Sequence, residues 1–456
     1  MHKSLPLALS LIAVAPFLGA EIPPANPFVQ TIYTADPAPL VHDGTVYVYT
    51  THDEDDSTWF TMYDWRCYSS TDMVNWTDHG VVLSVDDLTW ANKNAWAPQA
   101  IERNGKFYFY FPVERNEGGM AIGVAVSDSP TGPFEDALGE PLVFDESGDI
   151  DPSVFIDVDG QAYLSWGNPT YKWVRLNEDM ISYDTSVGDN GIFRHPMTVE
   201  AFGERTTDDR ATSYEEGPWF YLRDGLYYMF FAGGPVPEHL AYSTAPSPEG
   251  PWSYGGVIMP TQGGAFTNHP GVVDYKGQTY LFYHNAALPG GGGFNRSVCV
   301  DELEFGPDGE VIPLDMDPAG VAPVGTLDPY SRVEAETIAW TGGVETQRLE
   351  DRGMVVYDID DGDFIRVREV AFGEKGARRF TATVRGEAGG MIELRLDTPD
   401  GPLAGTLEIP STDGKWRTLR TRVEGATGTR DLYLVFKGEA ESEGELFAFD
   451  WWRFRR

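Results

Sequence analysis

The sequence is poor in cysteine, in basic residues and in long apolar runs, and each shortage argues against a class of protein. Its 456 residues include two cysteines, too few for a disulfide scaffold or a four-thiolate metal site. Lys and Arg total 33 against 71 Asp and Glu, and the net charge of −38 would repel nucleic acids and anionic membranes. Beyond the N-terminus, no window approaches the ~20 apolar residues of a spanning helix. Helical periodicity is nearly absent, which argues against helix bundles.

The chain is instead rich in aromatic residues, glycine and proline. Aromatics make up 13% of the residues and hydrophobic residues 41%, which argues for a folded protein despite the charge. The 50 glycines and 32 prolines indicate many turns and favour a β-rich fold. The length allows two or three domains.

Residues 1–20, MHKSLPLALSLIAVAPFLGA, have the pattern of a secretory signal peptide. His2 and Lys3 precede an apolar run that ends at Ala20, after which we expect cleavage. This run is too short to span a membrane. We therefore predict a secreted or periplasmic protein, and we expect it to be a monomer.

A hairpin pattern recurs between residues 27 and 320. Each copy has a proline, a short apolar run, a tight turn ending in glycine and a second apolar run, and the copies begin at Pro37, Pro98, Pro152, Pro218 and Pro270. Apolar runs joined by such turns are typical of β-hairpins. Weaker similarity among residues 68–83, 125–143 and 241–259 indicates two outer strands for each unit.

The repeat predicts an all-β fold in which a five-bladed β-propeller occupies residues 27–320. The alternative is one large β-sandwich whose hairpins are alike by chance. Residues 315–329 are rich in Pro, Gly and Ala and read as a linker. Residues 330–456 then change to short alternating strands, which predict a separate β-sandwich of the jelly-roll type.

The chemistry-bearing residues occupy one position of the repeat. The first strand of each propeller blade lines the central funnel, so the residues just before each repeat proline should meet there; they are Asp36, Trp96, Asp151, Glu216 and His269. Carboxylates gathered in one cavity repel, so the pKa of at least one should rise. A protonated acid beside an ionised base can hydrolyse a glycosidic bond. The alternative is that these acids cap strand starts or bind a cation at the axis.

These positions carry a resemblance to glycoside hydrolase family 43, in the motifs Ala35-Asp36-Pro37, Trp96-Ala97-Pro98, Asp149-Ile150-Asp151-Pro152 and Glu216-Gly217-Pro218. Residues 66–80 and 295–303 are most similar to the arabinofuranosidase and arabinoxylan arabinofuranohydrolase branches. The resemblance implies an inverting enzyme with Asp36 as general base and Glu216 as general acid. It also implies that Asp151 orients Glu216 and raises its pKa. The retaining fructosidase clan is a weaker match, because its motifs differ at Ala35, Ile150 and Gly217.

Four further residues are candidates around this site. Trp96 and Trp166 suit stacking on a sugar ring, the alternative for each being packing in the core. The resemblance implies that Arg296 reaches the terminal sugar. It also implies that His269 takes part around a central cation, often calcium.

Residues 330–456 resemble carbohydrate-binding module family 6, in residues 333–336, 356–364, 391–407, 414–416 and 449–452. The resemblance implies a structural calcium held by Glu334, Glu336 and Asp450. It makes Tyr357 and Trp416 the pair that sandwiches a sugar. Ala448 stands where the family usually has an asparagine, so the module could instead bind weakly, bind through another face, or serve for docking only.

We therefore predict an exported inverting hydrolase that removes α-L-arabinofuranosyl side chains from arabinoxylan or a related hemicellulose. Its expected partner is plant cell-wall polysaccharide, and calcium is the expected cofactor, with no organic cofactor. One alternative is a β-xylosidase or a dual xylosidase/arabinofuranosidase. A second is a sugar-binding propeller without catalysis.

Overall fold

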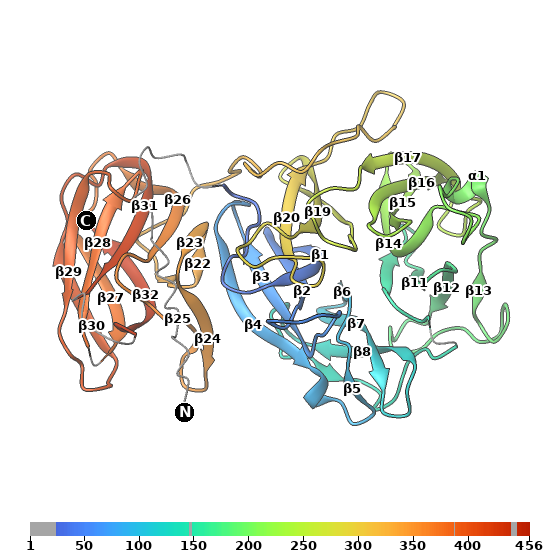
Figure 1. The fold of residues 1–456 in the computed structure, drawn as a ribbon, viewed down its shortest axis with the longest axis horizontal. Helices are drawn as coiled ribbons and strands as arrows, with labels where there is room; N and C mark the ends of the chain where they lie inside the picture. Colours follow the sequence, from blue (N-terminus) through green and yellow to red (C-terminus); the bar gives the residue numbers. More distant parts are fainter. Residues whose placement is uncertain (1–23, 146–147, 387, 439–444) are drawn as a thin grey trace, which may run out of the picture.

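The computed structural model describes residues 24–145, 148–386, 388–438 and 445–456. These residues form seven antiparallel sheets and almost no helix (Figure 1). The predicted signal peptide, residues 1–20, lies outside the described residues. No helix in the described part of the chain is long and apolar enough to cross a membrane.

Five sheets follow one another along the chain. The first contains β1 (Thr34–His42), β2 (Thr45–His52), β3 (Asp64–Ser70) and β4 (Trp76–Ser84), and is followed by the short helix η1 (Val85–Asp87). The second contains β5 (Ala91–Lys93), β6 (Gln99–Arg103), β7 (Lys106–Arg115), β8 (Met120–Ser127) and β9 (Glu135–Asp136). The third contains β10 (Ser153–Ile156), β11 (Ala162–Trp166), β12 (Lys172–Leu176) and β13 (Phe193–Arg194), and is followed by helix α1 (Val199–Phe202). The fourth contains β14 (Tyr214–Arg223), β15 (Leu226–Gly233), β16 (His239–Ala245) and β17 (Ser253–Met259). The fifth contains β18 (Gly271–Tyr275), β19 (Gln278–Asn285) and β20 (Ser297–Glu302).

The strands at the repeat prolines form a closed ring. We call the five sheets that contain these strands the sheet ring. Strand β1 contacts β6 and β18, β10 contacts β6 and β14, and β14 contacts β18. In Figure 1 the sheets follow one another around a common centre. The predicted hairpins are confirmed: at Asp43-Gly44 and Asn104-Gly105, for example, both turn residues have positive φ, as a tight hairpin turn requires.

The fifth sheet has three strands in the described residues, whereas the repeat predicts four. Residues from the N-terminal end of the described chain cover the outer edge of β20 instead. The side chain of Asn26 donates to the carbonyl of Val300 and accepts from its N–H, both at 3.0 Å, and the N–H of Phe28 donates to Val298. The start of the described chain thus supplies partners for three backbone groups on the edge of the last sheet, the carbonyls of Val298 and Val300 and the N–H of Val300.

Residues 330–456, here called the C-terminal module, form two sheets around one apolar core. One sheet contains β21 (Val333–Glu334), β24 (Glu345–Leu349), β25 (Gly353–Tyr357), β27 (Arg379–Arg385), β30 (Arg417–Arg422) and β32 (Ala448–Arg455). The other contains β23 (Trp340–Gly342), β26 (Phe364–Gly373), β28 (Gly390–Leu396), β29 (Leu403–Ile409) and β31 (Gly428–Lys437). Phe380, Leu434 and Trp452 are among the fully buried side chains of this core.

The C-terminal module docks on the sheet ring by adding a strand to it. Strand β22 (Thr337–Ile338) pairs with the outer edge of β4, so the first sheet gains a fifth strand from a distant part of the sequence (Figure 1). Asn75 reinforces the contact: its amide donates to the carbonyl of Arg368 at 2.9 Å and accepts from the Arg368 N–H at 2.8 Å. The hydroxyl of Thr346 also donates to Asp78 at 2.7 Å. The two parts of the chain therefore share backbone and side-chain hydrogen bonds.

Cys67 and Cys299 are free, buried thiols. Burial raises the pKa of both, so neither is an activated nucleophile. The two thiols are not joined in a disulfide.

We predict that Asn75→Ala weakens the docking of the C-terminal module. The change removes the partners of the N–H and carbonyl of Arg368 at a partly buried contact, which costs about 1 kcal/mol, less than at a fully buried one. Thermal unfolding should begin at a lower temperature, and protease should cut the segment between the sheet ring and the module sooner. Asn92→Ala, which removes an exposed side-chain hydrogen bond within the ring, is the matched control. Equal behaviour of the two variants would contradict the prediction.

Candidate active site

The three predicted carboxylates lie where the strands of the sheet ring begin. Asp36 is in β1, Asp151 lies two residues before β10, and Glu216 is in β14. Asp36 and Asp151 have φ values of 52° and 57°, in the left-handed region that Asp and Asn adopt more often than most residues with a side chain. The pairing of β1 and β14 with their neighbours shifts register at these points, next to the repeat prolines that cannot donate to the ladder. These irregularities turn the carboxylates out of the ladder and toward the centre.

The carboxylates share one pocket. The cavity has a volume of about 240 Å³ and is lined by Asp36, Trp59, Phe60, Met62, Trp96, Ala97, Ile150, Asp151, Asn168, Glu215, Glu216, Val236, Glu238, Thr267, His269 and Arg296. The repeat therefore predicted the members of the pocket that precede the prolines: Asp36, Trp96, Asp151, Glu216 and His269.

Asp36 is held in its ionised form. Burial alone would raise its pKa, but the positive charge of Arg296 and a hydrogen bond from Thr51 outweigh burial and lower it. Arg296 Nη1 lies 3.0 Å from Asp36 Oδ1, and the Thr51 hydroxyl donates to Oδ2 at 3.1 Å. The backbone N–H of Asp36 donates to His284 Nδ1 at 3.2 Å. An ionised carboxylate in a pocket can accept a proton from water.

Arg296 differs from its predicted role. Its Nε and Nη2 bind the two carboxylate oxygens of Asp53 at 2.9 and 2.8 Å, and its remaining N–H groups bind Asp36 and Thr267. A guanidinium has five N–H donors, and these contacts use all of them. Arg296 lines the pocket, but it acts on Asp36 and has no donor left for a sugar.

Glu216 and Asp151 favour the protonated form. Burial is the largest cause for both: it raises the pKa of Glu216 to about 7, with the charges of Glu215 and Asp36 adding to it. Burial and the nearby Glu216 raise the pKa of Asp151 well above its ordinary value. Asn168 Nδ2 donates to Glu216 Oε2 at 2.6 Å and partly offsets the rise.

Asp151 orients Glu216 through the backbone. Its Oδ2 accepts from the N–H of Gly217, the residue after Glu216, at 3.0 Å. Gly217 has a φ of 64°, and a Cβ there would lie 3.0 Å from the ring of His269, so this position needs glycine. One ionised and one protonated carboxyl group in the same pocket can act as a general base and a general acid.

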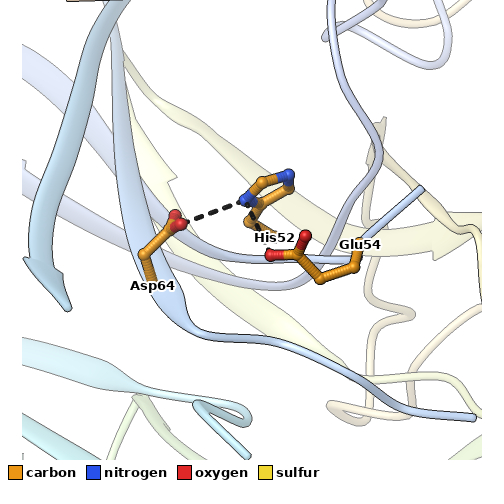
Figure 2. A group of neighbouring side chains, drawn as sticks. All are labelled: His52, Glu54 and Asp64. Atoms are coloured by element: carbon orange, nitrogen blue, oxygen red, sulfur yellow. Dashed lines mark hydrogen bonds and ion pairs between the residues drawn. The ribbon is translucent and has the colours of Figure 1, made fainter. Parts of the chain in front are cut away.

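His269 lines the pocket as a neutral ring. Burial lowers its pKa to about 4. The predicted axial cation has no cluster of ligands around it in the described residues. Three ligand-type side chains do lie within 4.8 Å of one another elsewhere, namely His52, Glu54 and Asp64. Figure 2 shows both carboxylates directed at His52 Nδ1, with Asp64 Oδ2 at 3.1 Å and Glu54 Oε1 at 3.9 Å. This contact joins the ends of β2 and β3, at the base of the loop that carries Trp59 and Phe60.

The two predicted tryptophans have different environments. Trp96 is half-buried and lines the pocket, and its Nε1 donates to the carbonyl of Phe60 at 3.0 Å. Trp166 is fully buried, and its Nε1 donates to Asp149 at 2.7 Å. The prediction that Trp166 contacts substrate is therefore wrong, because the ring is part of the core beneath the site.

The predicted calcium ligands of the C-terminal module lie close together. Strand β21 pairs with β32, which brings Glu334 beside Asp450, and Arg332 contacts both at 2.7 and 3.2 Å. Glu336 is buried, its Oε2 has no partner, and burial together with Glu334 raises its pKa well above the ordinary value. Carboxylate oxygens are the ligands that calcium prefers. Arg332 and Arg352 bind Asp450 in this structure, and Glu334, Glu336 and Asp450 do not place one oxygen each within 4.8 Å of the other two, so these side chains would have to move to hold an ion.

The two predicted sugar-binding aromatics already have partners. The Tyr357 hydroxyl donates to Glu345 at 2.6 Å. The ring of Trp416 has the guanidinium groups of Arg352 and Arg385 at 5.2 and 5.0 Å from its centroid. A sugar stacking on Trp416 would compete with these cation–π contacts.

Several pocket residues were not predicted. Asn168 lines the pocket and donates to Glu216, and Glu238 adds a further buried carboxyl group. Asp53 lies behind the pocket, where it binds Arg296. Trp59 and Phe60 form an aromatic cluster with Phe266 and Phe294 at the pocket. The aromatic loop residues were visible in the sequence, but they lie outside the repeat position that guided the prediction.

Comparison with known proteins agrees with this geometry. Residues 24–311 match the family model of glycosyl hydrolases family 43, and residues 334–456 match carbohydrate binding module family 6. The chain is 34% identical to the arabinoxylan arabinofuranohydrolase of Bacillus subtilis (strain 168), over 97% of this chain and 94% of that protein.

Two solved structures extend the comparison. A crystal structure of a family 43 arabinoxylan arabinofuranohydrolase from Bacillus subtilis, in complex with cellotetraose, has a TM-score of 0.81 and 32% identity, covering 95% of this chain and 98% of that one. The calcium-free form of CoXyl43, a β-xylosidase/α-arabinofuranosidase from a compost metagenome, has a TM-score of 0.57 and 31% identity, covering 65% of this chain and 98% of that one. The chain therefore belongs to glycoside hydrolase family 43, and it carries a family 6 carbohydrate-binding module at its C-terminal end.

Proposed function

We propose that this glycoside hydrolase removes α-L-arabinofuranosyl side chains from arabinoxylan or a related hemicellulose, with inversion at the anomeric carbon. The observation that carries the proposal is the pairing of an ionised Asp36 with a Glu216 that is protonated near neutral pH in one pocket. The arabinoxylan arabinofuranohydrolase of Bacillus subtilis, similar over nearly the whole chain, supports the substrate class.

In the proposed mechanism, Asp36 removes a proton from a water molecule while the water attacks the anomeric carbon. Glu216 gives its proton to the glycosidic oxygen as the bond to the polysaccharide breaks. Asp151 keeps Glu216 in position through the Gly217 N–H, and burial together with the charge of Glu216 raises the pKa of Asp151. After burial, the charges that raise the pKa of Glu216 are those of Glu215 and Asp36. Trp96 covers one side of the sugar and excludes water. A pocket, rather than an open groove, suits removal of a single terminal sugar.

The second candidate is a β-xylosidase or a dual enzyme. It is favoured by the similarity to CoXyl43, whose name gives both activities. The same three carboxyl groups would serve either reaction. A propeller that only binds sugar is disfavoured, because the buried acid and base are both present in the forms that hydrolysis needs.

We also propose a specific architecture, location and oligomeric state for the enzyme. The five sheets of the sheet ring are the five blades of a propeller spanning residues 27–320, and the C-terminal module, 330–456, is a jelly-roll sandwich. The N-terminal residues 1–20 direct export, so the enzyme is secreted or periplasmic and works as a monomer on plant cell-wall polysaccharide. The module holds the enzyme on that polysaccharide through Tyr357 and Trp416. For a sugar to stack on Trp416, the guanidinium groups of Arg352 and Arg385 must move off the ring.

Calcium is the proposed cofactor of the C-terminal module, held by Glu334, Glu336 and Asp450. When bound, the ion would offset the mutual repulsion of these carboxylates. No residue of the catalytic pocket depends on it, and no organic cofactor is needed.

The proposal is tested by proton NMR of the mature protein with arabinoxylan, followed from the first minutes. We expect free arabinose to appear first as the anomer opposite to that of the cleaved bond. Early release of xylose would support the second candidate. Absence of any sugar product from arabinose- and xylose-containing polymers would contradict both.

The roles of the carboxyl groups predict distinct losses. Glu216→Gln removes the transferable proton and Asp36→Asn removes the base, and each should lower kcat by at least about 10²-fold because general acid–base catalysis contributes at least that much. Asp301→Asn makes the same carboxyl-to-amide change at a buried site outside the pocket and serves as the control. Substantial activity of the Glu216→Gln variant would reject the acid assignment.

Asn168 should set the alkaline limit of activity. Glu216 must be protonated, so kcat/KM should fall as the pH rises through the Glu216 pKa of about 7. The hydrogen bond from Asn168 lowers that pKa, so Asn168→Ala should move the alkaline limb to higher pH. The pH profile of kcat/KM measures the shift, with Asn177→Ala, an exposed loop asparagine, as control. A shift toward lower pH would contradict the assignment.

Calcium should stabilise the C-terminal module. At a free concentration of 100 times Kd, binding adds about 2.7 kcal/mol of stability. We expect calcium to raise the unfolding temperature, chelator to reverse the effect, and Glu336→Gln to abolish it. Glu393→Gln, which alters an ion pair on the other sheet, should leave the calcium response intact. A calcium response that persists in Glu336→Gln would contradict the proposed ligand set.

A further inference from the structure

Glu238 is a buried carboxyl group in the pocket that the proposed acid–base mechanism does not use. It lies in the turn between β15 and β16, is 3% exposed, and lines the same cavity as Asp36 and Glu216. Its position is fixed by two hydrogen bonds to the segment before His269. Its N–H donates to the carbonyl of Phe266 at 3.0 Å, and its Oε2 accepts from the N–H of Asn268 at 2.7 Å.

The other carboxyl oxygen, Oε1, is buried and has no hydrogen-bond partner among the described residues. An unsatisfied buried polar atom is costly, and such atoms in native structures call for an explanation. Because Glu238 lines the cavity, a ligand bound there can supply the partner once the side chain turns Oε1 toward it. A ligand with hydroxyl groups is the partner that this site lacks.

The charge state of Glu238 follows from its neighbours. Burial, and then the charge of Glu216, raise the pKa of Glu238 well above its ordinary value. The carboxyl group is therefore neutral under the conditions in which Asp36 is ionised. Since Oε2 accepts the Asn268 N–H, the proton resides on Oε1, where it can be donated.

We infer that Glu238 is a specificity-determining residue whose neutral carboxyl group donates a hydrogen bond from Oε1 to one hydroxyl oxygen of the bound furanose. The inference rests on the proposed function, since it names a contact to the sugar in the same pocket. Glu238 transfers no proton in the reaction. It selects a sugar that presents a hydroxyl group at this position, because a sugar without it leaves Oε1–H unpaired.

Two substitutions separate a neutral donor from a charged acceptor. Glu238→Gln keeps the shape: the amide oxygen can accept from Asn268 and the NH₂ group can donate in place of Oε1–H. Glu238→Met keeps the length but removes both functions. Asp301→Asn is again the matched control outside the pocket. Thermal unfolding of each variant verifies that the fold is retained.

The test measures kcat/KM for 4-nitrophenyl α-L-arabinofuranoside and its 2-, 3- and 5-deoxy analogues. For the wild type, kcat/KM should be about tenfold or more lower with one of the three analogues than with the parent substrate. Glu238→Gln should stay within a few-fold of the wild type on every substrate. For Glu238→Met, kcat/KM on the parent substrate should be about tenfold below that of the wild type. With the analogue that the wild type discriminates against, the kcat/KM of this variant should be no lower than with the parent substrate.

The outcomes that overturn the inference are distinct. If Glu238→Met still discriminates against the same analogue as fully as the wild type, Glu238 does not contact that hydroxyl group. If Glu238→Gln is as impaired as Glu238→Met, the residue does not act as a neutral donor.

Equilibrium binding of L-arabinose and D-xylose to the same variants, measured by calorimetry, does not depend on turnover. Weaker sugar binding by Glu238→Met than by Glu238→Gln supports the inference, and equal binding by all variants overturns it. Failure of the wild type to hydrolyse the arabinofuranoside would reject the proposed function instead.

Discussion

The contact between Arg296 and the two aspartates, Asp36 and Asp53, is the interaction on which both the fold and the site depend. Arg296 directly precedes β20 in the last sheet of the ring, whereas Asp36 is in β1 and Asp53 directly follows β2, both in the first sheet. The ion pair therefore joins the beginning of the ring to its end. Removing one partner of a buried pair typically costs about 3–5 kcal/mol, because the other charge stays buried and uncompensated. Backbone hydrogen bonds reinforce this contact. The N–H of Thr34 donates to the carbonyl of Arg296, and the N–H of Arg296 donates to the carboxylate of Asp53.

Arg296 also determines which carboxyl group of the pocket is ionised. Asp36 lies against Arg296, which lowers its pKa, whereas Glu216, Asp151 and Glu238 form no ion pair with any described residue. Burial and the charges of nearby carboxyl groups raise the pKa of these three. Similar side chains thus acquire different chemistry from their distance to one guanidinium group. Hydrolysis of a glycosidic bond needs this asymmetry, because one group must accept a proton while another donates one.

The C-terminal module is more than an appended domain. Its strand β22 completes an edge of the first sheet, and Asn75, Asp78 and Thr346 hold the two parts together by hydrogen bonds. The first sheet also supplies Asp36 and the loop with Trp59 and Phe60. The module therefore supports the sheet that carries Asp36, and a polysaccharide bound by the module would have a fixed position relative to the pocket.

The sequence by itself determined the five hairpins, the change of pattern after residue 330, and the position in the repeat that carries the chemistry. These features are local: turn glycines, repeat prolines and alternating strands act within a few residues, so Asp36, Asp151, Glu216, Trp96 and His269 could be predicted as pocket residues. Only the tertiary structure decided what surrounds them. The burial of Trp166, the engagement of every Arg296 donor and the presence of Asn168 and Glu238 arise from contacts between residues distant in sequence, which the repeat does not encode. Charge state follows from such contacts, because the pKa of a buried carboxyl group depends on its neighbours in space rather than along the chain.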